Sequence, residues 1–467
     1  MTHGPAQDEV SRLLGLIEEL DPKIRAVNAV NPHALAEAKT LDRETAAGHR
    51  RSPLHGRAVL VKDNVDTAGL ASTAGSLALA DVPPSHDAPL VRRLRESGMV
   101  VLGKTNLSEW ANIRDDHSTS GWSAHGGLTR NPYALNRTAS GSSSGSGAAL
   151  AARLAAYAVG TETNGSITSP AACCGVVGLK PTVGLVPAEG VVPISWSQDS
   201  PGPMALTVRD VAALLDAMAG TSTADELTDD PRHAVRGLRV GVPRDLWGYS
   251  LAADATAERA LELLSRAGAV IVDDLALPAL KDLDDEVGIT LMLVELKVGL
   301  ARYLATRDAH VKTLADVIAF NRAHAESELP WFGQSLLEAA QETGGVASAA
   351  YLESVDACTS AGLVELDRTV GEHDLDALVA PATGPATPID LVNGDPGGGG
   401  GASDSSALAG SPILTVPIEL AHGLPVAVSL WGARGSEKTL LRLGRAVESG
   451  RDASTGPLPE PTYPEWV

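Results

Sequence analysis

Short apolar runs alternate with segments of helical periodicity along most of the chain. Near the start, residues 8–48 are predicted to be largely helical, because apolar side chains recur at helical spacing at Val10, Leu13, Leu14, Ile17 and Leu20. Ala58–Val61 follows as a continuous apolar run. Such a run is typical of a strand that is buried on both faces of a sheet.

The same pattern continues toward the end of the chain. Further apolar runs predict strands at Met99–Leu102, Tyr157–Gly160, Leu238–Val242, Ala269–Val272, Ala377–Ala380, Ile413–Ile418 and Pro425–Leu430. The segments between them predict helices at Pro89–Ser97, 145–158, 206–219, 253–267, 280–305 and 436–448. This alternation favours an α/β fold, with helices on both faces of a central sheet.

The composition allows a large core and disfavours two classes of partner. The chain has 467 residues, 44% of them hydrophobic, and its length alone allows two or three domains. Its formal net charge at pH 7 is −21. Because a strongly acidic surface repels phosphate groups, we expect neither nucleic acid nor an anionic membrane as a partner.

The cysteines and the first residues bear on the cellular compartment. Cys173 and Cys174 are adjacent, and a total of three leaves one cysteine over, so all three are expected to be reduced. The start, MTHGPAQDEVSRLLG, lacks the basic and apolar regions of a signal peptide. No run reaches the roughly 18 apolar residues that a membrane span needs. These features predict a cytoplasmic protein, and they leave its oligomeric state open.

Three polar features are candidates for chemistry. Lys62 ends the apolar run Ala58–Val61, a serine cluster reads Ser140-Gly-Ser-Ser-Ser-Gly-Ser146, and Gly165-Ser166-Ile167 lies further along. Hydrolysis of an amide needs an activated nucleophile, an acid for the leaving amine and donors for the oxyanion. A lysine and two serines in this order can supply a base, a proton relay and a nucleophile.

The stretch GSSSGSGAALAARLAAYAVGTETNGSITSPAACCGVVGLKPTVGLVP contains both serine motifs and resembles the signature region of the amidase signature family. The resemblance covers roughly residues 20–220 well and the C-terminal part more thinly. Family members hydrolyse amides with a Ser–Ser–Lys triad. The resemblance implies the family's α/β fold, a mixed central sheet flanked by helices on both faces. It further implies one domain over residues 1–467, with a helical cap around 220–345.

The resemblance also implies roles for individual residues. Ser166 matches the nucleophile, Ser142 matches the relay serine that a cis peptide bond holds, and Lys62 matches the base. The spacing between the two serines is the one usual in the family. Ser143 is expected to support the relay. The backbone amides of Thr163, Asn164, Gly165 and Ser166 are expected to form the oxyanion hole.

Physical chemistry adds one condition to these roles. Lysine acts as a base only when it is neutral, and its ordinary pKa is about 10.4. Burial lowers the pKa of a lysine because the ammonium group is costly to desolvate. The apolar neighbours Val59, Leu60 and Val61 are consistent with such burial of Lys62.

Each feature has a simpler interpretation when it is taken alone. A lysine at a strand end is usually solvated, a Ser/Gly cluster is usually a linker, and a lone serine is often a helix N-cap. Their common order and spacing favour the catalytic interpretation. An α/β-hydrolase with Ser143 as nucleophile, in the pattern Gly141-Ser-Ser-Ser-Gly145, is a weaker alternative because no strand is predicted directly before it.

Other motifs predict no cofactor. Gly98-Met-Val-Val-Leu-Gly-Lys-Thr105 matches the phosphate-loop pattern, but its central residues read as a buried strand, so nucleotide binding is not expected. The twelve histidines are scattered and form no zinc motif, so no metal is predicted. Residues 394–407 include five consecutive glycines and are predicted to form a flexible loop. The resemblance implies that this loop faces the active site.

One departure from the family pattern and one further resemblance concern the substrate. Many family members read GGSIR where this chain reads Asn164-Gly-Ser-Ile-Thr168. The arginine can hold a substrate carboxylate, whereas Thr168 cannot. The segment RDDHSTSGWSAHGGLTRNPYALNRTASGSSSGSG resembles the bacterial peptide-amidase branch, whose members cleave peptide C-terminal amides. Trp331 and Phe332 either line a substrate groove or hold a surface loop to the core.

We therefore expect hydrolysis of a neutral carboxamide through an acyl-enzyme on Ser166, with a peptide C-terminal amide as the first candidate. An amidase for small aliphatic or aryl amides is the alternative within the same class. A non-catalytic or glutaminase-type subunit of an amidotransferase complex is the alternative from another class. The presence of Lys62, Ser142 and Ser166 together argues against a non-catalytic protein.

Overall fold

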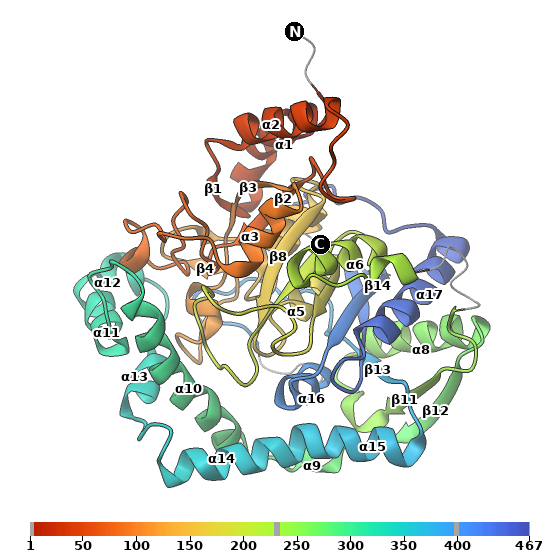
Figure 1. The fold of residues 1–467 in the computed structure, drawn as a ribbon. Coiled ribbons are helices and arrows are strands. Elements are labelled where there is room, and N and C mark those ends of the chain that lie inside the picture. The colour runs from red at the N-terminus through yellow and green to blue at the C-terminus, as the bar shows by residue number, and fades with distance from the viewer. Residues whose placement is uncertain (1–3, 228–233, 397–400, 467) are drawn as a thin grey trace.

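The computed structural model describes residues 4–227, 234–396 and 401–466. In these ranges, eleven strands form one sheet at the centre of the molecule (Figure 1). The order across the sheet is β1-β3-β2-β8-β10-β9-β14-β15-β13-β11-β12. The strands are β1 (Val27–Val30), β2 (Ala58–Lys62), β3 (Val100–Thr105), β8 (Tyr157–Glu162), β9 (Val177–Lys180), β10 (Ser200–Ala205), β11 (Arg239–Pro243), β12 (Val270–Leu275), β13 (Ala377–Pro381), β14 (Ile413–Ala421) and β15 (Leu424–Trp431).

The sheet is mixed, as predicted. β2 pairs in parallel with β3 and β8, and β11 pairs in parallel with β12 and β13. Antiparallel pairs join these two groups. They run from β8 through β10, β9, β14 and β15 to β13. The two parallel groups therefore lie on opposite sides of a central antiparallel region.

Helices cover both faces of the sheet. Val59 and Val61 of β2 belong to the core under α3, α6, α8 and α17, whereas Ala58 and Leu60 belong to the core under α1, α2, α4 and α5. Successive side chains of a strand point to opposite faces, so the continuous apolar run serves both layers. These helices are α1 (Pro5–Ile24), α2 (Ala34–Ala46), α3 (Pro89–Glu96), α4 (Ser144–Ala151), α5 (Thr168–Cys173), α6 (Val208–Ala219), α8 (Leu251–Arg266) and α17 (Glu437–Thr455).

A further group of helices lies beside the sheet (Figure 1). Three of them, α10, α11 and α13, pack on Trp110, Ile113 and Val192. The predicted cap at 220–345 is wrong in its bounds, because β11 and β12 fall inside this range and extend the sheet. The group comprises α9 (Pro278–Lys281), α10 (Asp285–Ala305), α11 (Leu314–Ala323), α12 (Ala325–Glu328), α13 (Ser335–Glu342), α14 (Ala349–Thr359) and α15 (Glu365–His373).

Two predicted helices are longer than the observed ones. The helical region 8–48 is interrupted, because Arg25 adopts a left-handed φ of 50° at the end of α1 and the chain then forms the edge strand β1. The predicted helix 145–158 ends early at Ala151. Arg153, with a φ of 60°, leads the chain from there into β8.

Strands β9 and β10 were not predicted. β10 reads Ser-Pro-Gly-Pro-Met-Ala, a composition that argues against a central strand because proline donates no ladder hydrogen bond. It pairs with β8 along its whole length but with β9 only at Met204 and Ala205. The two prolines therefore lie where β9 is not paired.

Two sequence motifs have plain structural outcomes. Val100–Thr105 of the phosphate-loop pattern is the fully buried strand β3, as predicted, and Lys104 Nζ donates to Thr67 Oγ1 at 3.1 Å and to Ser72 Oγ at 3.2 Å. Residues 397–400 of the predicted glycine loop lie outside the described residues. The end of that loop is helical instead, because α16 (Ala402–Ala409) packs Ala402 and Ala409 into the core.

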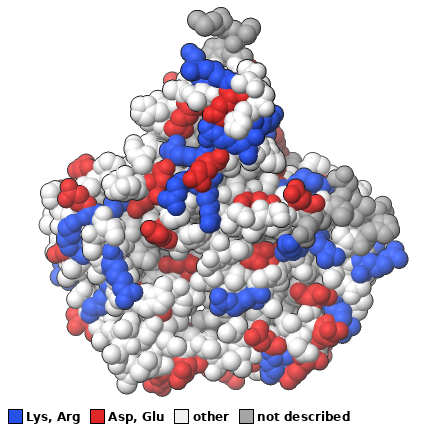
Figure 2. Space-filling model, viewed as in Figure 1, with Lys and Arg blue, Asp and Glu red and all other residues white. Residues whose placement is uncertain are grey.

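The surface shows both signs of charge. On the face shown in Figure 2, acidic and basic side chains are interspersed, and Lys and Arg gather over the N-terminal helices. The expected exclusion of nucleic acid stays a prediction. Among the helices in the described ranges, none has the length and apolar character that crossing a bilayer requires.

A buried cluster around Arg114 joins the end of α12 to the segment that follows β3. Arg114 is fully buried, and its Nη1 lies 2.6 Å from Glu109 Oε1 and donates to the carbonyl of Glu328 at 2.6 Å. The Arg114 guanidinium lies 4.1 Å from the ring centre of Phe332. Glu328 Oε1 accepts from the backbone N–H of Leu77 at 2.8 Å. The cluster therefore fixes two segments that are far apart in the sequence.

Arg114→Ala is expected to lower the free energy of unfolding by about 3–5 kcal/mol, because the Glu109 carboxyl and the Glu328 carbonyl stay buried without their hydrogen-bond donor. Chemical denaturation of variant and parent measures the difference. Arg322→Ala is the matched control, since its pair with Glu338 is exposed and such pairs contribute less than about 1 kcal/mol. Equal losses in the two variants would contradict the role given to Arg114.

Candidate active site

Two parallel strands bring the predicted base to its surroundings. Val61 of β2 lies opposite Val159 of β8, so Lys62, which ends β2, lies beside Thr161 of β8. The Lys62 side chain is fully buried. Its Nζ donates to Thr161 Oγ1 at 2.9 Å and to the Thr161 carbonyl at 3.2 Å. One residue of the neighbouring strand thus supplies two acceptors for the amine.

Two serines supply two more hydrogen-bond acceptors for the Lys62 amine. Lys62 Nζ lies 2.8 Å from Ser142 Oγ and 3.0 Å from Ser143 Oγ. The peptide bond between Gly141 and Ser142 is cis, the geometry that the resemblance implied. A side chain at Gly141 has no room, because a Cβ there would lie 2.2 Å from Ser108 Oγ. The serine cluster is therefore a tightly packed turn and not a linker.

Ser166 joins this group through the backbone. Its carbonyl accepts a hydrogen bond of 3.0 Å from the backbone N–H of Ser143. Ser166 is 8% exposed, whereas Lys62, Ser142 and Ser143 have no exposed surface. The backbone thus brings the chain at Ser166 next to Ser142 and Ser143, and Ser166 is the member of the predicted triad that retains some exposed surface.

Burial lowers the pKa of Lys62 toward neutrality, as the predicted role of a base requires. Removal from water lowers its pKa to about 7, while the carboxylates of Glu162 and Asp199 act in the opposite direction and raise the pKa. Its hydrogen-bond acceptors are hydroxyl and carbonyl oxygens of Thr161 and the two serines, so no carboxylate of the described residues holds its proton directly. The lowered pKa therefore makes the neutral amine accessible near pH 7.

The loop Thr163–Ser166, hereafter the oxyanion loop, presents unused backbone donors. The N–H groups of Asn164, Gly165 and Ser166 donate to no acceptor among the described residues. Gly165 has a φ of +80°, a conformation that residues with a side chain rarely adopt. Backbone donors without an internal partner are what an oxyanion hole needs. The oxyanion role of the four amides, including that of Thr163, stays a prediction.

Glu162 fixes the end of this loop and was missed by the sequence analysis. Its Oε2 accepts from the backbone N–H groups of Ile167 at 2.6 Å and Thr168 at 2.8 Å. It also accepts from the hydroxyl of Thr168 at 3.1 Å. Glu162 lies in the sequence Gly160-Thr-Glu-Thr-Asn-Gly-Ser166, directly after the predicted strand Tyr157–Gly160. A carboxylate at the end of a buried strand is the feature of the sequence that indicates it.

The predicted substrate contact at Thr168 has a different environment from the one expected. Thr168 is 3% exposed, and its hydroxyl is bonded to the carboxylate of Glu162. Thr168, two residues after Ser166 in the sequence, thus makes its observed contact with a buried side chain of the protein. A role in contacting substrate stays a prediction for Thr168.

The two predicted aromatic contacts differ in exposure. Phe332 is 9% exposed and packs edge-to-face on Trp122, with ring centres 5.3 Å apart. Of the two interpretations for Phe332, this packing favours attachment of a loop to the core. Trp331 is 47% exposed, and both residues line a cavity of about 550 Å³ together with Asp115 and His117. Neither aromatic residue lines the cavity beside the oxyanion loop.

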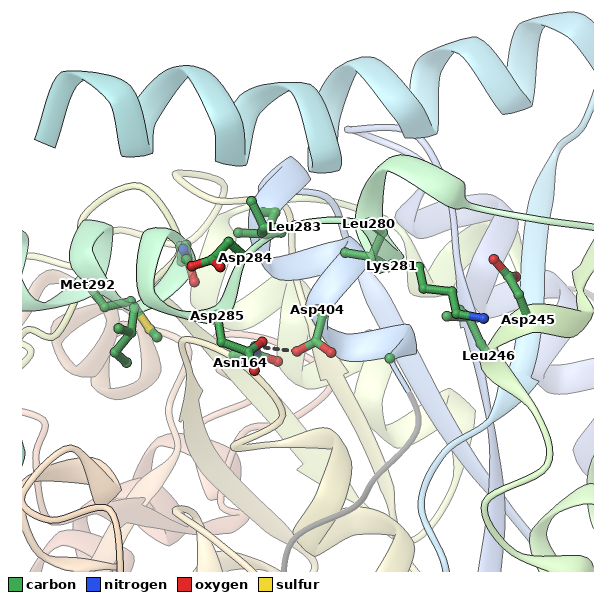
Figure 3. A pocket seen from close by; sticks show the side chains of 15 residues that line it. Asn164, Asp245, Leu246, Leu280, Lys281, Leu283, Asp284, Asp285, Met292 and Asp404 are labelled. Atoms are coloured by element: carbon green, nitrogen blue, oxygen red, sulfur yellow. Dashed lines mark hydrogen bonds between the residues drawn. The ribbon is translucent and has the colours of Figure 1, made fainter. Parts of the chain in front are cut away.

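That second cavity, of about 440 Å³, adjoins the loop at Asn164 (Figure 3). Four carboxylates line it together with one lysine: Asp245, Asp284, Asp285, Asp404 and Lys281. Apolar side chains such as Leu246, Leu280 and Met292 complete the wall. Asp404 Oδ1 accepts a hydrogen bond of 2.6 Å from Asn164 Nδ2. No sequence signal connected Asp404 with Asn164, because the two residues lie far apart in the chain.

Other reactive features concern metal ligands and thiols. In the described ranges, no group of three or more His, Cys, Asp or Glu side chains is arranged to hold a metal ion. Cys173, Cys174 and Cys358 are free thiols and buried. Ser143, the nucleophile of the weaker alternative, is fully buried and bonded to Lys62.

The chain is similar to known proteins over nearly its full length. The family model for Amidase matches residues 8–441. A protein of Arabidopsis thaliana named "Probable amidase" is 36% identical, over 94% of this chain and 85% of that protein. A glutamyl-tRNA(Gln) amidotransferase subunit of an Anaeromyxobacter species is 36% identical, over 97% of this chain and 94% of that protein. The crystal structure of peptide amidase from Stenotrophomonas maltophilia superposes with a TM-score of 0.88 and 46% identity, covering 97% of this chain and 95% of the other.

Turnover is expected to fall on acidification with an apparent pKa near the value of about 7 given for Lys62, because the base is lost as its amine takes up a proton. The sign follows from the requirement for the neutral form: activity is present above this pKa and absent well below it. A pH–rate profile of kcat measures it. Lys62→Arg keeps a cation that does not deprotonate and should abolish turnover at every pH. A residually active Lys62 variant with an unchanged acid limb would show that another group titrates.

Proposed function

The chain belongs to the amidase family and is an amide hydrolase, and we propose that its substrates are neutral carboxamides, above all the C-terminal amides of peptides. The observation that carries the proposal is the 46% identity to a peptide amidase over nearly the whole length of both chains. The charge around the oxyanion loop supports it independently.

That charge disfavours an anionic substrate. The cavity beside Asn164 is lined by four aspartates, and Lys281 is the one basic side chain among its described lining residues. Thr168 offers no cation at the position where many relatives carry an arginine. A carboxylate brought into this environment would lose water without gaining a partner. Free glutamine carries such a carboxylate, whereas a peptide amide carries none near its reacting carbonyl.

The proposed reaction begins with attack of Ser166 Oγ on the amide carbon. The Ser166 proton passes to Ser142 Oγ as Ser142 gives its own proton to the neutral Nζ of Lys62. The carbonyl oxygen becomes an oxyanion and accepts hydrogen bonds from the amides of Asn164, Gly165 and Ser166. The distance of 2.8 Å between Lys62 Nζ and Ser142 Oγ is suited to the second proton transfer.

Collapse of this intermediate breaks the C–N bond. The proton returns from Lys62 through Ser142 to the leaving nitrogen, which departs as ammonia, and the acyl group stays on Ser166 as an ester. Water then attacks the ester and gives one proton to Lys62 by the same relay. The carboxylic acid leaves, and Ser166 recovers its proton.

Ser166→Ala is expected to lower kcat by roughly 10⁴-fold or more, because the attacking oxygen is lost. Ser143→Ala is the matched comparison and should cost only about ten- to a hundredfold, since it removes hydrogen bonds to Lys62 and Thr161 but no reacting atom. Both are measured as ammonia release from a peptide amide, with thermal unfolding to confirm the fold. The reverse order of effects would assign the nucleophile to Ser143.

A peptide amide should be preferred to free glutamine by at least about a hundredfold in kcat/KM, because the glutamine carboxylate finds no fixed cation beside Thr168. The two substrates are compared at one ionic strength, with acetamide and an aryl amide as small neutral references. A preference for glutamine would favour an amidotransferase-like activity. A preference for the small amides would overturn the peptide assignment and keep the amidase.

A further inference from the structure

Three carboxylates from three parts of the chain hold the oxyanion loop. Glu162 holds its C-terminal end through the amides of Ile167 and Thr168. Asp199 holds its N-terminal end, because Asp199 Oδ1 accepts from Thr163 Oγ1 at 2.6 Å. The third, Asp404, holds the middle of the loop.

The contact of Asp404 with the loop is direct and short. Asn164 Nδ2 donates to Asp404 Oδ1 at 2.6 Å (Figure 3). Both side chains are exposed and line the cavity. This hydrogen bond is the contact observed between them. A hydrogen bond to an ionised carboxylate is shorter and stronger than one between neutral groups.

Asp404 itself belongs to a fixed element. The neighbouring residues of α16, Ser405 and Ser406, are buried. Ser405 Oγ accepts from the indole N–H of Trp431 at 3.2 Å, and Ser406 Oγ donates to the carbonyl of Ser411 at 2.8 Å. α16 is therefore attached to the sheet, and Asp404 connects that rigid support with the loop.

We propose that Asp404 is a positioning residue, which acts through Asn164 to fix the backbone amides that receive the oxyanion. The inference rests on the proposed function, because it assigns those amides to the reaction. Oxyanion donors stabilise a transition state only if they are already oriented toward it. The amides of Asn164 and Gly165 have no other partner among the described residues, and a glycine at a φ of +80° restrains the backbone weakly.

A purely local explanation of Asp404 exists, and it predicts something different. Asp404 lies in the first turn of α16, where a carboxylate stabilises a helix by interacting with its dipole. If that were its whole role, loss of the carboxylate would change stability and leave the chemistry of intact molecules unchanged. Affinity for an analogue of the tetrahedral intermediate separates the two roles, because it does not depend on the fraction of folded enzyme.

The test uses Asp404→Ala, Asn164→Ala, the double variant and the conservative Asp404→Asn. Each is assayed for kcat and KM on a dipeptide amide and for the inhibition constant of a dipeptide aldehyde, which forms an oxyanion when serine attacks it. Asp282→Asn is the control, since it removes an exposed carboxylate of the neighbouring segment that does not line the cavity.

Each single alanine variant should lose roughly ten- to a hundredfold in kcat with little change in KM, and the aldehyde should bind weaker by a similar factor. The double variant should lose no more than either single one, because both remove the same hydrogen bond. Asp404→Asn keeps an acceptor oxygen and should stay within about threefold of the parent. Asp282→Asn should match the parent.

Parental kcat and aldehyde affinity in Asp404→Ala would overturn the inference, as would losses that add in the double variant. Either result leaves the proposed function intact as long as Ser166→Ala is inactive. An active Ser166→Ala enzyme would instead overturn the mechanism itself, whatever Asp404→Ala does. The two failures are thus distinguishable.

Discussion

The burial of Lys62, with no directly bonded counter-ion among the described residues, is the constraint on which the site depends. A fully buried ammonium is costly, and none of the carboxylates in the described ranges forms an ion pair with Lys62 to offset this cost. It provides hydroxyl and carbonyl oxygens instead, which accept from the amine but do not lock its proton. The result is a lysine whose pKa of about 7 suits proton transfer at neutral pH.

Two carboxylates lie near Lys62, but they accept hydrogen bonds from other groups. Glu162 accepts from the amides that follow Ser166, and Asp199 accepts from Thr163 and from the backbone of Ile194 and Ser195. Their charges raise the pKa of Lys62 without bonding to it. Two of the three carboxylates that hold the oxyanion loop, Glu162 and Asp199, are therefore also the residues that limit how far the pKa of Lys62 falls. Positioning of the loop and tuning of the base are coupled.

The sequence predicted the parts of this arrangement that are local. Lys62, Ser142 and Ser166 lie in contiguous motifs, and β2 reads as a continuous apolar run because both of its faces are covered. β10 was not predictable from composition, because its two prolines are tolerated only where the partner strand β9 is unpaired. Asp404 gave no signal at all, since only the packing of α16 brings it to Asn164. Contacts made by distant segments depend on tertiary structure, which propensity and spacing do not report.

Thr168 contributes to these electrostatics through its contact with Glu162. Its hydroxyl donates to Glu162, whose second oxygen is buried and has no hydrogen-bond partner among the described residues. A neutral residue here leaves the full charge of Glu162 available to raise the pKa of Lys62. An arginine at the same position would place a cation near both groups, attract a substrate carboxylate and lower the pKa of the lysine further. Under the proposed function, the residue at this position therefore bears both on the pKa of Lys62 and on the charge of the substrate.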